Sequence, residues 1–252
     1  MIDSVICIHT FNRLNYTKQT LNSIFDNTTQ RYKIVVVDDV STDGTIEYLT
    51  ELQKQGKIDF VKKESHTGRQ HSFALKRYHG YKSGLKYIIM LDNDTPAMVK
   101  GWLTEFIDAY ENLKKNWKGK TIPILCGLNI GEKSYGEKME IGGKRYARAP
   151  WLGGGGWLIE HDILDKIGWD ELEPVHIESR FMHGQQMVKN AKGESVGWIC
   201  DADYRDRAVA RGFEHTFVYI KIPSLLDHIG LNGVHCKTNH IHRGDGWGVT
   251  NL

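Results

Sequence analysis

The chain has 252 residues, of which 40% are hydrophobic and 25% are charged; this composition excludes a disordered chain, a collagen-like chain and a disulfide scaffold. Its 33 basic and 31 acidic side chains give a formal charge of +2, so charge does not single out a nucleic-acid-binding protein. Glycine (26) and histidine (12) are numerous. Glycine lets backbone approach a ligand, and histidine ligates metals and moves protons.

The first 125 residues alternate between short apolar runs, which predict buried strands, and amphipathic stretches, which predict helices. We expect strands at residues 4–8, 33–37, 58–61, 87–91 and 122–126. We expect helices at residues 14–25, 45–55, 73–85 and 99–113. This alternation predicts an α/β fold with a mostly parallel sheet covered by helices on both faces.

The pattern changes after about residue 127, where glycine becomes dense. Residues 133–148 alternate loosely and predict a hairpin or an irregular loop. Further elements are expected at residues 161–168 (helix), 201–211 (helix) and 216–222 (strand). We expect residues 1–126 and 127–252 to form two halves packed as one unit, the second ending in a polar tail.

Cysteine usage and apolar run lengths bear on the compartment. The four cysteines are far apart and form no CxxC pair, so neither a zinc ribbon nor a thioredoxin-type site is indicated. Cys7 and Cys126 lie in apolar runs and are expected to be buried thiols. The longest apolar run, residues 87–91, is far shorter than a membrane helix. With no signal peptide visible, we expect a cytoplasmic protein, either free or peripheral to a membrane, with no integral membrane segment.

Parallel sheets bind ligands at the carboxyl ends of their strands, so the residues after each strand carry the functional prediction. The first strand is followed by HTFNR, the second by DDVSTDGT and the fourth by Asp92-Asn93-Asp94. Two carboxylates one residue apart repel each other unless a cation lies between them. The Asp92/Asp94 pair therefore predicts a metal site, with a solvated turn as the alternative.

Helix capping is the alternative function for polar residues in these loops. Thr10 or Asn12 could accept hydrogen bonds from the first amides of the following helix. The sequence Asp43-Gly44-Thr45 is typical of a turn that begins a helix.

The motifs HTFNR, VVVDDVSTDGT and MLDNDT, in this order and at these separations, resemble family-2 glycosyltransferases of the GT-A fold. Val40 stands where the family usually has glycine, and Cys200 where it usually has glutamate. The resemblance continues through LGGGGWLI and the segment after Cys200 to Pro223 and His228, covering about residues 4–228. It implies a Rossmann-like sheet flanked by helices, with a smaller acceptor-side lobe.

The resemblance also implies an activity, the inverting transfer of a hexose or pentose from a nucleotide-sugar to an acceptor hydroxyl. Mn²⁺ or Mg²⁺ would stabilise the charge on the leaving diphosphate. The implied protein ligands are Asp94 and His228, while Asp92 would reach the ribose or a metal-bound water. Carboxylates suit these ions and Mn²⁺ tolerates imidazole; a core or surface histidine is the alternative for His228.

The same resemblance places the nucleotide. Its pocket is expected to be lined by residues after the first strand, namely Thr10, Asn12 and Arg13. Asp38 or Asp39 would accept a hydrogen bond from the base, expected to be uracil. Arg69 would pair with a phosphate or a base carbonyl, or else be a solvated surface charge.

An inverting transfer also needs a general base facing the acceptor. Asp201 aligns with the family's catalytic aspartate and Asp203 is the next choice; helix N-capping is the alternative for both. On the acceptor side, Gly154 and Gly155 would let backbone approach the sugar and Trp157 would stack on it. A surface loop and core packing, respectively, are the alternatives.

Two other functions fit the same sheet. One is a nucleotidyltransferase, which usually has a glycine in the loop after its first strand; HTFNR has none. The other is a nucleotide-sugar-binding module without catalysis, which would not need the intact acidic residues Asp92, Asp94 and Asp201. A UDP-linked donor is expected. The acceptor stays open between a glycan, a lipid-linked sugar, a protein and a modified base in DNA, and the oligomeric state is open as well.

Overall fold

The computed structural model describes residues 3–66, 69–128, 136–149, 155–167, 176–182, 185–189, 204 and 208–229. Within these ranges it describes the backbone alone for residues 69–74, 176–182 and 185–189. All statements below refer to this part of the chain.

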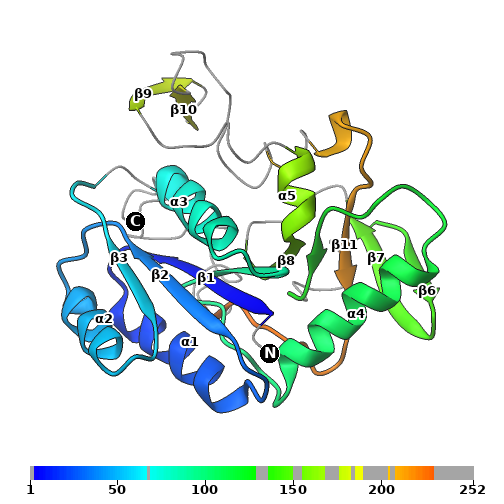
Figure 1. The fold of residues 1–252 in the computed structure, drawn as a ribbon, viewed down its shortest axis with the longest axis horizontal. Coiled ribbons are helices and arrows are strands. Elements are labelled where there is room, and N and C mark those ends of the chain that lie inside the picture. The colour runs from blue at the N-terminus through cyan, green and yellow to red at the C-terminus, as the bar shows by residue number, and fades with distance from the viewer. Residues whose placement is uncertain are drawn as a thin grey trace, which may run out of the picture.

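The N-terminal half forms a parallel sheet (Figure 1). Its strands pair in the order β3-β2-β1-β4, and each pairing is parallel. The strands are β1 (Ser4–Thr10), β2 (Lys33–Asp38), β3 (Asp59–Lys62) and β4 (Tyr87–Asp92). Every residue of β1 and of β4 is buried, as continuous apolar runs predict for strands covered on both faces. The four predicted strands are confirmed.

The second half continues the same sheet with mixed pairing, so that the described residues form one nine-stranded sheet of the expected α/β class. β8 (Trp157–Glu160) lies antiparallel between β4 and β5 (Leu125–Cys126). β11 (Thr216–Tyr219) follows, parallel to β5. The hairpin of β6 (Lys138–Ile141) and β7 (Lys144–Ala149) forms the edge.

Three details of this half differ from the sequence expectation. β5 and β11 are shorter than predicted. β8 was not expected as a strand, because the four glycines before it obscure its apolar run. A separate antiparallel pair, β9 (His176–Met182) and β10 (Gln185–Lys189), lies where no element was predicted.

Helices cover both faces of the sheet, α1 and α2 on one side and α3 on the other (Figure 1), as right-handed crossovers require when the chain reverses its direction across the sheet. The helices are α1 (Leu14–Asn27), α2 (Thr45–Lys54), α3 (Arg69–Lys82), α4 (Trp102–Asn116) and α5 (His161–Ile167). Of the helix expected over residues 201–211, Tyr204 and residues 208–211 are described; Tyr204 and residues 208–210 are helical, and Arg211 lies in a turn. No helix of the described segments is both long and apolar enough to cross a bilayer.

The core confirms the two expected buried thiols. Cys7 and Cys126 are fully buried, and burial raises the pKa of each to about 12. Both are therefore protonated and unreactive at neutral pH.

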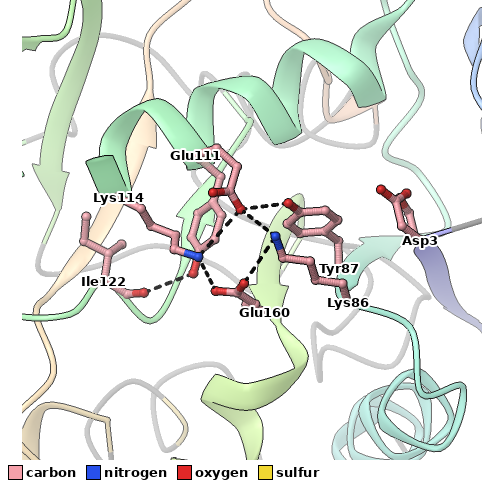
Figure 2. Close-up of polar contacts among 9 residues, drawn as sticks. Asp3, Lys86, Tyr87, Glu111, Lys114, Ile122 and Glu160 are labelled. Carbon is pink, nitrogen blue, oxygen red and sulfur yellow. Dashed lines mark hydrogen bonds and ion pairs between the residues drawn. The ribbon is translucent and has the colours of Figure 1, made fainter. Parts of the chain in front are cut away.

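A ring of four charges ties α4 to β4 and β8 (Figure 2). Lys86 Nζ lies 3.2 Å from Glu111 and 3.7 Å from Glu160, and Lys114 Nζ lies 3.6 Å and 2.6 Å from the same two carboxylates. The Tyr87 hydroxyl also donates to Glu111 at 2.7 Å. Because the lysines and Glu111 are partly exposed, each pair stabilises the fold only slightly.

A more enclosed cluster forms around Glu105 of α4. Its carboxylate accepts a hydrogen bond from the Tyr219 hydroxyl at 2.6 Å and lies 3.0 Å from Lys144 Nζ and 2.9 Å from Lys221 Nζ. Burial by itself would raise the pKa of Glu105, but the bonds from Tyr219, Lys221 and Lys144 outweigh it and lower the pKa to about 2. The cluster joins α4 to β7 and β11.

This lowered pKa predicts a pH-dependent contribution to stability. A carboxylate with a depressed pKa in the folded state stabilises the protein above its unfolded pKa of roughly 4.3, and this contribution disappears as pH falls towards 2. We therefore expect Glu105→Gln to lower the urea midpoint at pH 7, with a deficit relative to wild type that shrinks between pH 4.5 and 2. The exposed Glu140→Gln on β6 controls for loss of one carboxylate. A Glu105→Gln deficit that is constant over this range would contradict the assignment.

Candidate functional site

The ends of β1, β2 and β4 lie side by side at one edge of the sheet. In the parallel register His9 of β1 is paired with Asp92 of β4, and Thr10 is paired with Asp38 of β2. The candidate residues were predicted at the carboxyl ends of these strands, and the observed strand register brings them together there.

The two expected metal ligands, Asp94 and His228, form one cluster with Asp92 at this edge. The ligand atoms of Asp92, Asp94 and His228 all lie within 4.8 Å of one another, and His228 Nε2 is 3.5 Å from Asp94 Oδ1. Asp94 is only 2% exposed. Two carboxylates and an imidazole are a donor set that fits Mn²⁺, and one that Mg²⁺ can share through the carboxylates. The residues present therefore fit the expected cation.

His228 reaches this cluster because residues 225–229 run alongside residues 94–98. The Ile229 amide donates to the Asp94 carbonyl at 3.0 Å, and the Met98 amide donates to the Leu225 carbonyl at 2.9 Å. An isolated bridge pairs Ala97 with Leu226. These backbone bonds fix a residue more than 130 positions away in the chain next to Asp94.

Asn93 anchors the turn that carries the two carboxylates. Its side-chain Nδ2 donates to Thr10 Oγ1 at 3.2 Å and lies 3.3 Å from Thr17 Oγ1, while its backbone carbonyl accepts from Thr20 Oγ1 at 3.0 Å. Asn93 is therefore held against β1 and α1. No sequence pattern indicated this anchoring role of Asn93. Thr10 was expected to line the nucleotide pocket, but its hydroxyl is engaged in this buried network.

Each carboxylate of the pair also contacts a positively charged side chain. Arg13 Nη1 lies 2.9 Å from Asp94 Oδ2. Lys76 Nζ lies 3.1 Å from Asp92 Oδ1 and donates to the Leu91 carbonyl at 2.7 Å, and its side chain is 0% exposed. Lys76 was missed in the sequence. The available signal is its position four residues before Gly80, because residues four apart share a helix face.

Asp38 and Asp39, which the sequence could not separate, have different surroundings. Both oxygens of Asp38 accept bonds from Ser41, one from its amide at 2.9 Å and one from its hydroxyl, and burial raises the pKa of Asp38. Asp38 thus stabilises the turn formed by residues 38–41. Val40 within that loop has φ 66°, a left-handed conformation that is strained for a β-branched residue, which explains why a glycine is usual at this position.

Asp39 faces the loop after β3 instead. Lys63 Nζ forms a close ion pair with Asp39 Oδ1, and His66 Nδ1 lies 2.9 Å from Asp39 Oδ2. Burial lowers the pKa of Lys63, opposed by its bond to Asp39. The His66 ring stacks on Phe11 with centroids 4.3 Å apart. Of the two aspartates, Asp39 is the one whose carboxylate is directed between loops, and its contact with the base stays a prediction.

The loops after β1 and β2 hold each other. The Asn12 side chain accepts a hydrogen bond from the Thr42 amide at 2.8 Å, and the Asn12 amide donates to Ser41 Oγ at 2.7 Å. In return Asp43 accepts from the Leu14 amide at 2.8 Å. The capping role considered for Thr10 or Asn12 therefore belongs to Asp43, which also bonds Thr45 at the start of α2, as predicted.

The expected acceptor residues are described only in part. A Cβ on Gly155 would lie 3.1 Å from Asp92 Oδ2, so its backbone closely approaches the carboxylate pair. Trp157 is 1% exposed within β8, with its ring 6.3 Å from that of Tyr204; it packs in the core, which was the alternative to stacking on a sugar. Asp201, Asp203 and Gly154 lie outside the described residues, as does the side chain of Arg69.

Comparison with known proteins identifies the family. Residues 5–167 match the family described as Glycosyl transferase family 2. The chain belongs to this family. It is 29% identical over 90 residues to an uncharacterized glycosyltransferase of Rickettsia bellii (strain RML369-C), covering 35% of this chain and 12% of that protein. It is 31% identical over 87 residues to the putative teichuronic acid biosynthesis glycosyltransferase TuaG of Bacillus subtilis (strain 168), covering 33% and 32%.

Solved structures show the same fold. S. aureus TarS in complex with UDP-GlcNAc has a TM-score of 0.58 at 14% identity, covering 100% of this chain and 62% of that chain. GalNAc-T7 with UDP, GalNAc and Mn²⁺ has a TM-score of 0.57 at 15% identity, covering 89% and 42%. This family-2 chain therefore has the GT-A fold and spans only part of the length of these relatives.

The cap from Asp43 yields a stability prediction. Replacing a side chain that caps a helix N-terminus by alanine typically costs about 1 kcal/mol. Asp43→Ala should therefore lower the free energy of unfolding by about this amount, and Asp43→Asn by less because an acceptor oxygen remains. Asp26→Ala on the exposed face of α1 is the control, expected within about 0.5 kcal/mol of wild type. Urea unfolding monitored by circular dichroism measures all three. An Asp43→Ala loss no larger than that of the control would refute the capping role.

Proposed function

We propose that the protein is an inverting, metal-dependent glycosyltransferase that moves a sugar from a UDP-sugar to an acceptor hydroxyl. The observation that carries the proposal is the cluster of Asp92, Asp94 and His228, with ligand atoms within 4.8 Å of one another at the carboxyl edge of a GT-A sheet. Family membership favours glycosyl transfer over the nucleotidyl transfer considered from the sequence.

The cluster and its cationic neighbour suit a diphosphate leaving group. A divalent cation held by Asp94 and His228, with Asp92 on the ribose or a bound water, would neutralise the charge that builds on the diphosphate. The side chain of Arg13 is 19% exposed and lies 2.9 Å from Asp94. It is thus a second positive group able to contact a phosphate oxygen at this edge.

Uracil is the base that best matches Asp39 and its neighbours. The imide N–H of uracil would donate to the Asp39 carboxylate, while the Lys63 ammonium and the ring of His66, both already in contact with Asp39, flank that position. Uracil has a carbonyl on each side of its imide N–H, and these two carbonyls could accept hydrogen bonds from Lys63 and His66. Two structural neighbours were solved with UDP or UDP-GlcNAc, which supports a uridine donor.

The transfer step needs one proton acceptor. In the proposed reaction Asp201 takes the proton of the acceptor hydroxyl, and the hydroxyl oxygen forms a bond to the anomeric carbon on the face opposite the diphosphate. The bond from that carbon to the diphosphate oxygen breaks, and UDP leaves with the electron pair. The configuration at the anomeric carbon is inverted. Asp203 is the second choice for the base, and this assignment rests on the sequence resemblance.

Release of UDP from UDP-sugars in the presence of Mn²⁺ tests the proposal. We expect Asp94→Asn and His228→Ala each to lower the rate by about 100-fold or more, because each weakens stabilisation of the leaving group, and a chelator to abolish release. Asp162→Asn is the matched control and should keep the wild-type rate, since Asp162 is an exposed carboxylate in the His161–Asp162–Asp165 group. This group follows Glu160, which is paired with Tyr87 at the opposite end of β4 from Asp92.

Two results would refute the proposal. One is wild-type protein that releases no UDP from any UDP-sugar tested with Mn²⁺ and candidate acceptors, which would favour a binding module without catalysis. The other is a folded Asp94→Asn variant with the wild-type rate.

A further inference from the structure

Lys76 is a fully buried cation below the carboxylate pair. Its side chain is 0% exposed, and Nζ lies 3.1 Å from Asp92 Oδ1 and 2.7 Å from the carbonyl oxygen of Leu91. A buried lysine is rare unless it is paired. Leu91 and Asp92 are the last two residues of β4, so the ammonium group is fixed at the end of the strand that carries Asp92.

The packing of α3 on the sheet explains how Lys76 reaches this position. A Cβ on Gly80 would lie 2.7 Å from Ile88 Cγ2 and 3.0 Å from Cys7 Sγ, so α3 approaches β1 and β4 as closely as a glycine allows. Lys76 lies one turn earlier on the same helix face. Its side chain therefore extends along β4 and ends under Asp92 without reaching solvent.

The two positively charged side chains beside the carboxylate pair, Arg13 and Lys76, differ in how easily they can move. Arg13 contacts Asp94 with a side chain that is 19% exposed, so it can leave that carboxylate for a phosphate without crossing the core. Lys76 is enclosed, and moving away from Asp92 would leave its ammonium group buried without a counter-charge, which is strongly unfavourable. Lys76 therefore stays beside Asp92 when a cation or nucleotide arrives.

We propose that Lys76 is a positioning residue that acts through Asp92 as a fixed counter-charge of the cation site. Lys76 holds Asp92 Oδ1 and leaves Asp92 Oδ2 facing Gly155. Its positive charge lowers the affinity of the site for a free divalent cation. Tight cation binding then requires the negative charge of the donor's diphosphate. This inference rests on the proposed function, because it assumes that the cluster binds a cation together with a nucleoside diphosphate.

The size of the effect follows from Coulomb's law. Removing one unit charge about 6 Å from a divalent ion changes its affinity about tenfold even at the dielectric constant of water. Lys76→Met removes both the charge and the hydrogen bond, whereas Lys76→Gln removes the charge and keeps a donor. Both should bind free Mn²⁺ about tenfold or more tightly than wild type does.

The test is a titration with Mn²⁺ alone and with Mn²⁺ plus UDP, following free Mn²⁺ by electron paramagnetic resonance. We expect UDP to tighten Mn²⁺ binding to wild type at least tenfold, and both Lys76 variants to bind Mn²⁺ more tightly than wild type in the absence of UDP. Lys86→Met is the matched control. It removes the same charge at the opposite end of β4 from the exposed ring of Figure 2, and it should leave both Mn²⁺ affinities unchanged.

A double variant tests whether the effect passes through Asp92. In an Asp92→Asn background, Lys76→Gln should keep the roughly tenfold effect of the removed charge but lose any further gain that comes from freeing Asp92 Oδ1; an effect as large as in the Asp92 background would overturn the assignment to Asp92. Free Mn²⁺ affinities equal to wild type in Lys76→Gln and Lys76→Met would overturn the inference, and so would failure of both variants to fold, which would make Lys76 purely structural. Wild-type protein that binds no Mn²⁺ even with UDP would instead refute the proposed function.

Discussion

The repulsion between two carboxylates one residue apart is the constraint on which this site depends. Asp92 ends β4, whose residues are all buried, and Asp94, two residues later, is buried as well, so little water is available to screen them. Each carboxylate forms an ion pair with a basic side chain. Asp92 pairs with Lys76 on the core side, and Asp94 pairs with Arg13 on the more exposed side. Asn93 between them is tied to hydroxyls of β1 and α1, which keeps both carboxylates directed towards the edge of the sheet.

The other parts of the site depend on how loops at this edge support each other. Asn12 bonds the loop after β2, and Asp43 of that loop caps α1, so Arg13 at the start of α1 is held by residues about 30 positions away. The segment around His228 is fixed along residues 94–98 by backbone bonds. The parallel strands bring these loops to one edge, and reciprocal side-chain bonds fix their positions.

The sequence predicts the framework of this site well, because the framework is local. Apolar runs locate β1, β2 and β4, and the acidic residues that follow them necessarily meet at the carboxyl edge of a parallel sheet. The pairing of Asp94 with His228 followed from resemblance, since no local pattern links residues so far apart. Lys76 was missed because a lysine in a helix is ordinarily solvated, and only the close approach at Gly80 shows that this helix face is buried. Likewise, the antiparallel insertion of β8 depends on pairing with β4 and β5, which its glycine-rich flank conceals.

The most direct measurement is a crystal structure of the protein with UDP and Mn²⁺, using anomalous scattering to locate the metal. We predict an anomalous peak within bonding distance of Asp94 and His228, with the diphosphate beside it and Lys76 still in contact with Asp92. A peak elsewhere, or UDP bound with no peak at this cluster, would contradict the claim that the carboxylate pair at the end of β4 is the cation site.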